Sequence, residues 1–222
     1  MTIRLFIYLG LSLVTCKPQI TPTEDTPSAS SAPKENFDQL KQQVLLLVDS
    51  SYTNLDDFGS LVESYLVSPN GSAQQVSDSV ALGQAQKLLS KELNQTMPRP
   101  VFKERDTDHM VLLLIRNNQA AMVLVDKNAN TIVNLHFLPG FKTDQLKDKK
   151  VTFQQQLVGL SIDFTEDNFA LVPWEGELDP QKMQVDGITG ATPICEASLD
   201  MLNTQLPFYK DYFMINKEGN NL

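Results

Sequence analysis

One short segment of the chain combines residue types and spacing that could do chemistry, namely residues 186–193, Asp-Gly-Ile-Thr-Gly-Ala-Thr-Pro. Gly190 and Ala191 leave steric room beside the hydroxyl of Thr192, and glycine takes backbone angles that other residues avoid. Thr192 and Pro193 predict the start of a helix, with Thr192 as the N-cap and the proline at the first helical position. Unbonded N–H groups and the positive end of the helix dipole would favour an anion there. The alternative interpretation is a turn that only caps a helix.

The same segment resembles the flavin-attachment motif of FMN-binding domains in two membrane redox complexes. These are the C subunit of the Na+-translocating NADH:quinone reductase and the G subunit of the Rnf complex. The resemblance implies that Thr192 carries FMN through a phosphoester bond, with Asp186 as the acidic residue upstream. The turn between them would include Thr189, Gly190 and Ala191.

In such a protein FMN does the redox chemistry and the polypeptide holds and tunes it. The resemblance implies a separate flavin transferase that installs the FMN, and membrane redox proteins as electron-transfer partners. It therefore implies an electron carrier, or a subunit of an oxidoreductase complex, rather than a stand-alone enzyme. Weaker matches extend over residues 110–213: Pro139 and Gly140 match the family's loop, residues 153–159 resemble its helix, and residues 206–213 resemble its tyrosine-containing tail.

The first residues of the chain resemble an export signal. Arg4 precedes an apolar run, residues 5–14, that is too short to span a bilayer as a helix and has the length of a signal-peptide core. The run ends in Leu-Val-Thr-Cys, which resembles a bacterial lipobox and predicts lipidation of Cys16. The predicted location is therefore the cell envelope, with the domain anchored to a membrane on the extracytoplasmic, periplasmic side. An ordinary signal peptide or an uncleaved anchor is the alternative.

The rest of the chain divides by composition. Residues 17–36 are rich in Pro, Ser and Thr and predict a disordered tether, because such a segment buries too little apolar surface to order itself. We expect a helical N-terminal region at 37–108, an FMN-binding domain at 109–215 and a flexible tail at 216–222.

Periodicity predicts the elements and the fold class. Helical spacing is found at 37–48, 55–67, 80–93 and 151–160, and apolar runs at 110–115, 120–125, 131–137 and 169–172 predict strands. Short polar turns between the first three runs predict an antiparallel meander. A last helix begins at the Thr192 motif. The sequence therefore predicts an α+β fold, with an antiparallel or mixed sheet covered by helices on one side and an N-terminal helical extension.

Composition and missing motifs exclude other functions. The formal net charge of −9 argues against nucleic acid as a partner, because phosphate backbones require clustered Lys and Arg. His109 and His136 lie in or beside predicted strands without the further ligands that a metal site needs. We interpret Cys195 as a small packed residue, and Trp174 as a structural residue that could alternatively stack near a flavin. A second hypothesis for the function is a lipoprotein binding module without a cofactor, in which the Thr192 motif is only a helix cap.

Overall fold

The computed structural model describes residues 32–49, 51, 54–90, 96–139, 150–164, 168–172, 183–187 and 191–218. The predicted signal peptide with Cys16, the predicted tether up to residue 31, and Trp174 lie outside the described residues. Residues 32–222 form one compact unit. Within the described ranges, none of the helices has the length and apolar character that a bilayer span requires.

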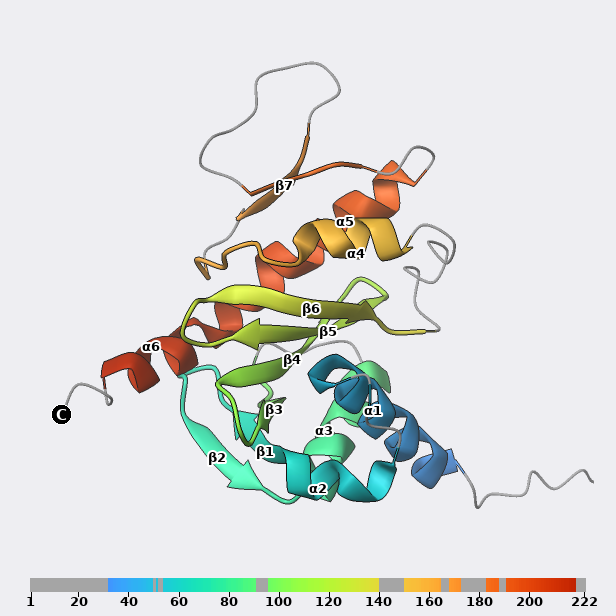
Figure 1. Cartoon of the computed structure of the whole chain (residues 1–222), viewed down its shortest axis with the longest axis vertical. Coiled ribbons are helices and arrows are strands. Elements are labelled where there is room, and N and C mark those ends of the chain that lie inside the picture. Colours follow the sequence, from blue (N-terminus) through green and yellow to red (C-terminus); the bar gives the residue numbers. More distant parts are fainter. Residues whose placement is uncertain are drawn as a thin grey trace, which may run out of the picture. The chain divides into compact units, whose positions relative to one another are not determined.

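A six-stranded antiparallel sheet is the centre of the fold (Figure 1). Its strand order is β2-β1-β3-β4-β5-β6. The predicted meander is confirmed as β4, β5 and β6, and its first turn is Asn117–Asn118, both at positive φ, as two-residue hairpin turns of type I′ require. The strands are β1 Val62–Val67, β2 Ala73–Val76, β3 Arg99–Glu104, β4 His109–Arg116, β5 Gln119–Asp126 and β6 Thr131–Phe137.

Helices cover both faces of this sheet, not one face as the sequence suggested (Figure 1). One layer contains α1 Ala32–Val48, η1 Leu55–Asp57, α2 Phe58–Leu61 and α3 Asp78–Ser90. The other contains α4 Lys150–Leu157, α5 Thr192–Gln205, η3 Leu206–Tyr209 and α6 Lys210–Glu218. The α+β fold class is confirmed. α1 begins in the segment expected to be tether, and α6 continues past residue 215, where the domain was expected to end.

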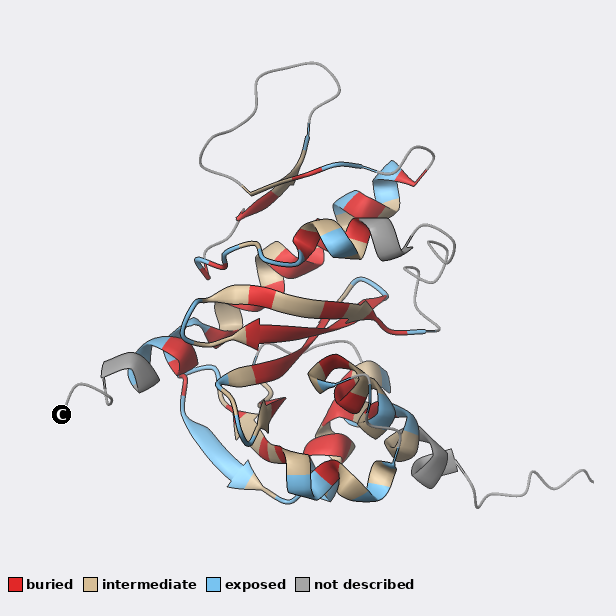
Figure 2. Cartoon of the chain, in the orientation of Figure 1, coloured by how far each residue is buried: buried red, intermediate tan, exposed pale blue. Residues whose placement is uncertain are grey.

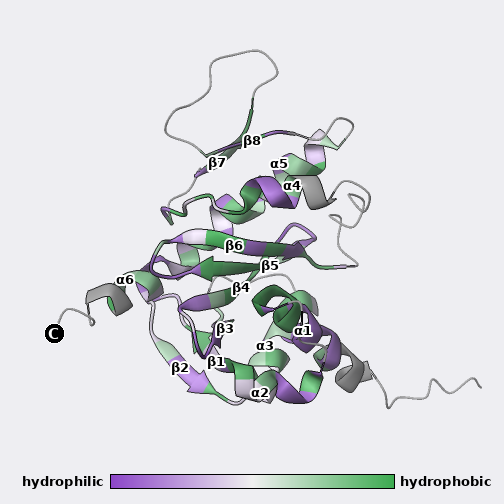
Figure 3. Cartoon of the chain, in the orientation of Figure 1, coloured by the Kyte–Doolittle hydropathy of each residue, from purple (hydrophilic) through white to green (hydrophobic). Residues whose placement is uncertain are grey.

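Side chains of β4 and β5 alternate between two hydrophobic cores. Leu112 and Val123 belong to the core under α5, whereas Leu113 and Leu124 belong to the core under α1 and α3. Because both faces are covered, these antiparallel strands are apolar at every position between their end residues instead of alternating with polar residues. Figure 2 shows β5 buried along most of its length, and Figure 3 shows the same strand as hydrophobic.

The helix predicted at 55–67 is wrong over its second half. Helical structure ends at Leu61, and residues from Val62 onward form β1, which pairs with β3 over six residues. Ser64 is buried within β1 and its hydroxyl donates a hydrogen bond to a carboxylate oxygen of Asp78 at the start of α3, 2.7 Å away. Of the two partners of β1, β3 is distant in sequence and β2 is a short, mostly exposed polar strand, so local helical spacing was the misleading signal.

Strand β3 was not predicted either. Pro98 and Pro100 in this segment indicated the end of a helix rather than a strand. In the structure β3 pairs with β4 only from Val101 to Lys103, so Pro100 has a neighbouring strand on one side alone, where a missing N–H is tolerated. The region 37–108, expected to be helical, therefore contributes three strands to the sheet.

The N- and C-terminal parts of the unit are joined at two close contacts. Gly71, in the β1–β2 turn at φ +77°, approaches α6 so closely that an added Cβ would lie 2.6 Å from the Cβ of Asp211. Arg99 is 2% exposed, its guanidinium carbon lies 3.8 Å from the ring centre of Phe208, and its Nη1 donates to the carbonyl oxygen of Gln205 at 3.3 Å. Burial raises the pKa of Tyr209, beside Arg99, to about 12.

A second, two-stranded sheet lies beyond α5 and consists of β7 Phe169–Leu171 and β8 Met183–Val185 (Figure 3). The two strands are parallel, with Ala170 opposite Gln184. β7 was predicted from the apolar run 169–172, whereas β8 was not predicted, because its three residues are interrupted by Gln184 and form no apolar run. This small sheet positions the first half of the motif at residues 186–193.

Candidate functional site

The two halves of the motif lie at the ends of two different elements. Asp186 and Gly187 follow β8 directly and are exposed, whereas Ala191 leads into α5. Thr189 and Gly190 were predicted to form the turn between them, and residues 188–190 lie outside the described residues. The structure thus places Asp186, Ala191 and Thr192 among the described residues of the motif.

The start of α5 differs from the sequence prediction by one residue. Ala191 is the N-cap, and its carbonyl oxygen accepts hydrogen bonds from the N–H groups of Ile194 at 3.0 Å and Cys195 at 3.1 Å. Thr192 is therefore the first helical residue and Pro193 the second. The reason is that Ala191 already provides the first helical acceptor, so the hydroxyl of Thr192 is not needed as a cap. Within the described part of the chain that hydroxyl has no hydrogen-bond partner.

Burial divides the first turn of α5 into an inner and an outer side. Ala191 is 8% exposed and Cys195 is fully buried in the core, whereas Thr192, Pro193 and Glu196 are exposed. The interpretation of Cys195 as a packed residue is confirmed. The outer side presents the hydroxyl of Thr192 to solvent at the positive end of a helix of 14 residues.

A side-chain amide from α4 holds the other half of the motif. The backbone N–H of Asp186 donates to Oε1 of Gln156 at 2.7 Å, and Nε2 of Gln156 donates to the carbonyl oxygen of Asp186 at 3.4 Å. Both bonds use the main chain of Asp186, so its carboxylate is left to face solvent. Sequence reasoning missed Gln156, because a glutamine on a helix carries no local signal of such a role.

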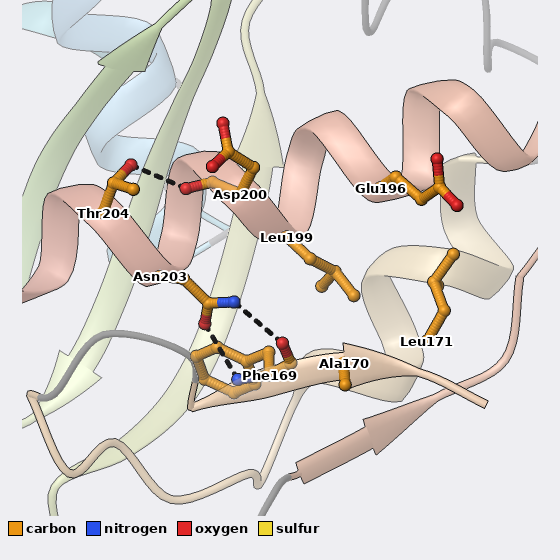
Figure 4. Close-up of a pocket in the computed structure, with 8 residues that line it drawn as sticks. All are labelled: Phe169, Ala170, Leu171, Glu196, Leu199, Asp200, Asn203 and Thr204. Atoms are coloured by element: carbon orange, nitrogen blue, oxygen red, sulfur yellow. Dashed lines mark hydrogen bonds between the residues drawn. The ribbon is translucent and has the colours of Figure 1, made fainter. Parts of the chain in front are cut away.

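A second amide, from α5, holds strand β7 in the same manner. The backbone N–H of Phe169 donates to Oδ1 of Asn203 at 2.8 Å, and Nδ2 of Asn203 donates to the carbonyl oxygen of Phe169 at 2.8 Å (Figure 4). Each strand of the small sheet therefore has its own amide clamp, Asn203 for β7 and Gln156 for β8. Sequence reasoning missed Asn203 for the same reason as Gln156.

A hollow of about 330 Å³ lies between β7 and α5 (Figure 4). Glu196 and Leu171 line one end of it, and Asn203 and Phe169 the other. The hollow adjoins both halves of the motif: a Cβ on Gly187 would be 3.7 Å from Leu171, and Glu196 is one helical turn from Thr192. The remaining lining residues are Ala170, Leu199, Asp200 and Thr204.

Acidic residues dominate the charge around this site. Asp186 and Glu196 are exposed, and Asp200 accepts a hydrogen bond from Nε of Arg116 in β4 at 2.6 Å. Within the described part of the chain, Glu196 has no ion-pair partner. These carboxylates therefore weaken the electrostatic attraction of the site for a free anion, whereas a covalently attached anion does not depend on that attraction.

The two histidines lie in the large sheet. Nδ1 of His109 is 3.1 Å from a carboxylate oxygen of Glu104, and His136 in β6 is partly buried, which lowers its pKa. Among the described residues, no group of three or more His, Cys, Asp or Glu side chains could hold a metal ion. Pro139 of the predicted loop is exposed, and Gly140 lies outside the described residues.

Comparisons with known proteins give one finding at the level of the fold. No family model matches the chain, and no curated protein matches its sequence. The structure is similar to a crystal structure of Shewanella oneidensis NqrC, with a TM-score of 0.61 at 18% sequence identity. The similarity covers 83% of this chain and 99% of the NqrC chain. It confirms the predicted resemblance as a likeness of fold, and it extends into the N-terminal half, beyond residues 110–213.

Proposed function

We propose that the chain is an extracytoplasmic electron carrier with FMN bound covalently to Thr192. The observation that carries the proposal is the exposed hydroxyl of Thr192 on the first turn of α5, directly after an Asp-Gly-Ile-Thr-Gly-Ala sequence, in a fold similar to that of NqrC. When bound, FMN supplies the electron-transfer chemistry, and the chain positions and tunes it.

The described residues fit an esterified phosphate. Thr192 presents an oxygen nucleophile without a competing hydrogen bond within the described part of the chain, and the helix start favours negative charge. In attachment, Oγ1 of Thr192 forms a bond to the FMN phosphorus of FAD, the pyrophosphate bond breaks and AMP leaves. The hydroxyl proton passes to a base of the flavin transferase or to solvent. The clamp from Gln156 holds the main chain of Asp186, six residues before Thr192, and leaves this residue exposed to the transferase.

The experiment compares two threonines of α5 after coexpression with a flavin transferase. The peptide containing Thr192 should gain the mass of an FMN ester, and Thr192→Ala should lose all flavin that survives denaturation. Thr204→Ala is the matched control, because Thr204 lies on the same helix and donates to the carbonyl oxygen of Asp200 at 2.6 Å. Covalent flavin on Thr192→Ala contradicts Thr192 as the attachment residue. No covalent flavin on the unchanged chain contradicts the whole proposal and favours the cofactor-free binding module.

The proposal includes membrane attachment through lipid on Cys16 and electron exchange with membrane redox proteins. It rests on the lipobox-like sequence, and several acyl chains are needed for stable anchoring. Cys16→Ser should release the protein into the soluble fraction or block signal cleavage. A Cys16→Ser variant that stays membrane-bound with a normally processed N-terminus would show that another contact holds the protein.

A further inference from the structure

On the edge of β7 that faces away from β8, the main-chain N–H and C=O of one residue form no hydrogen bond with a described side chain. In the parallel pair, the carbonyl of Asn168 accepts from the N–H of Met183 and the N–H of Val172 donates to Val185, so Asn168, Ala170 and Val172 face β8. Phe169 and Leu171 therefore direct their N–H and C=O groups away from β8, toward α5.

These two outward positions are treated differently by α5. Phe169 is bonded on both groups by the amide of Asn203, at 2.8 Å each. One turn earlier on α5, level with Leu171, the side chain is the apolar Leu199. Within the described part of the chain, the N–H and C=O of Leu171 consequently have no hydrogen-bond partner, and Leu171 lines the hollow shown in Figure 4.

The chemistry of this edge selects one kind of ligand. The backbone N–H and C=O of one residue are matched by a ligand that carries an acceptor and a donor side by side, as the Asn203 amide does. A cyclic imide also carries a C=O acceptor next to an N–H donor. An added peptide strand would need every second residue of the edge. Phe169 is already occupied, and residue 173 is a proline, which has no N–H. A quinone has acceptors only and could satisfy the N–H of Leu171 but not its C=O.

The geometry points to the hollow between β7 and α5 as the site that receives the flavin ring, with its pyrimidine N–H and C=O paired to the main chain of Leu171, at the end of the hollow that Glu196 also lines. The inference rests on the proposed attachment to Thr192. Leu199 lies seven residues after Thr192, which is about 10 Å along the axis of α5. The ribityl phosphate chain and the ring together can span this distance. The hollow's volume of about 330 Å³ is near the lower end for small-molecule sites, and its open side leaves part of the ring accessible to a redox partner.

Two substitutions at Leu171 separate the main-chain contact from the side chain. Leu171→Pro removes the outward N–H without removing a ladder bond to β8, and Leu171→Ala keeps that N–H. On FMN-loaded protein, the flavin of the unchanged chain and of Leu171→Ala should tumble with the protein in time-resolved fluorescence anisotropy. In Leu171→Pro the ring should gain fast local motion, and iodide quenching should rise by about threefold or more, since one of its paired bonds is lost.

The charge of Glu196 gives an independent measurement on variants that keep the strand intact. Glu196→Gln should shift the equilibrium of the flavin with a reference redox dye toward reduced flavin by about tenfold at low salt, because a nearby carboxylate opposes added negative charge. Asp56→Asn is the charge-matched control on the layer across the large sheet, and it should leave this equilibrium within about twofold.

The outcomes distinguish the inference from the function on which it rests. Flavin attached to Thr192 with the same anisotropy and quenching in Leu171→Pro as in Leu171→Ala overturns the ring site and leaves the carrier function standing. An unchanged dye equilibrium in Glu196→Gln likewise overturns it. No covalent FMN on the unchanged chain overturns both. Amide hydrogen exchange of β8 in Leu171→Pro shows whether the small sheet is still formed. If the sheet is lost, the Glu196→Gln measurement alone tests the ring site.

Discussion

The two sheets of this protein are held together by different means. In the large sheet, β4 and β5 are paired over eight residues and lie between two hydrophobic cores, so backbone pairing and apolar burial reinforce each other. In the small sheet, each strand has three residues, of which only Phe169 and Val185 are buried in the core under α5, and a side-chain amide bonds the main chain of β7 and another the residue after β8. An isolated pair of strands is marginally stable in water. The motif is therefore carried by the part of the molecule whose geometry depends on few, specific contacts.

This difference predicts that core substitutions and clamp substitutions have separable effects. Leu112 in β4 is fully buried in the core under α5. Leu112→Ala should lower the free energy of unfolding by about 2–5 kcal/mol, since it removes buried methyl groups and leaves a cavity. Urea denaturation measures the loss. Val80→Ala is the control, because Val80 is 49% exposed and should change stability by less than about 0.5 kcal/mol. Equal effects of the two would contradict the described core.

The turn between β1 and β2 tests how tightly the large sheet is joined to the C-terminal helix. Gly71→Ala should cost about 2–4 kcal/mol, because Gly71 has φ +77° and a new Cβ would lie 2.6–2.8 Å from Asp211 and Tyr212. Gly159→Ala is the matched control, with φ +85° and no atom within 4 Å of a new Cβ. It should cost only the backbone strain, about 1–2 kcal/mol. Thermal unfolding of both variants gives the difference, and a Gly71→Ala no worse than Gly159→Ala would show that α6 moves aside.

The sequence predicted the meander β4–β6 better than the other strands for a physical reason. β4, β5 and β6 are long apolar runs separated by short polar turns, and neighbours in sequence are neighbours in space. β1 was mistaken for a helix because its neighbour in sequence, β2, is short, polar and mostly exposed, while its other partner, β3, follows only after α3, and local periodicity does not contain that pairing. The second helical layer was missed because a strand buried on both faces was interpreted as buried on one.

Only the part of the candidate site that lies in one continuous segment, residues 186–193, could be predicted from the sequence. Thr192 and its turn were chosen as a candidate from the residue types of one segment and from the family resemblance, and their role stays a prediction. The N-cap was misplaced by one residue. Gln156 and Asn203 were missed because their role arises from packing: each is a polar residue on a helix, and only the folded chain brings it to a strand edge.

The clamp on β7 should control local opening rather than global stability. Asn203→Ala removes two hydrogen bonds to Phe169, worth about 1–3 kcal/mol together. Native-state hydrogen exchange should show faster exchange of the Phe169 amide, while amides of β4 and β5 keep most of their protection. Asn128→Ala is the control, since Asn128 donates to Asp108 in a loop of the large sheet, at 2.7 Å. Unchanged exchange at Phe169 would mean that the core beneath it, not the amide, holds β7.

The ion pair between β4 and α5 should contribute least of all. Nε of Arg116 is 2.6 Å from the Asp200 carboxylate, but the two side chains are 36% and 46% exposed. Exposed pairs lose much of their attraction to solvent screening, so a double-mutant cycle of Arg116→Gln and Asp200→Asn should give a coupling below about 1 kcal/mol, weaker still at high salt. A coupling above about 2 kcal/mol would mean that charge, as well as the core beneath it, ties α5 to the large sheet. Asp200 also lines the hollow. If the coupling is weak, Asp200→Asn can remove a negative charge from the hollow without loosening α5, the helix that carries Thr192.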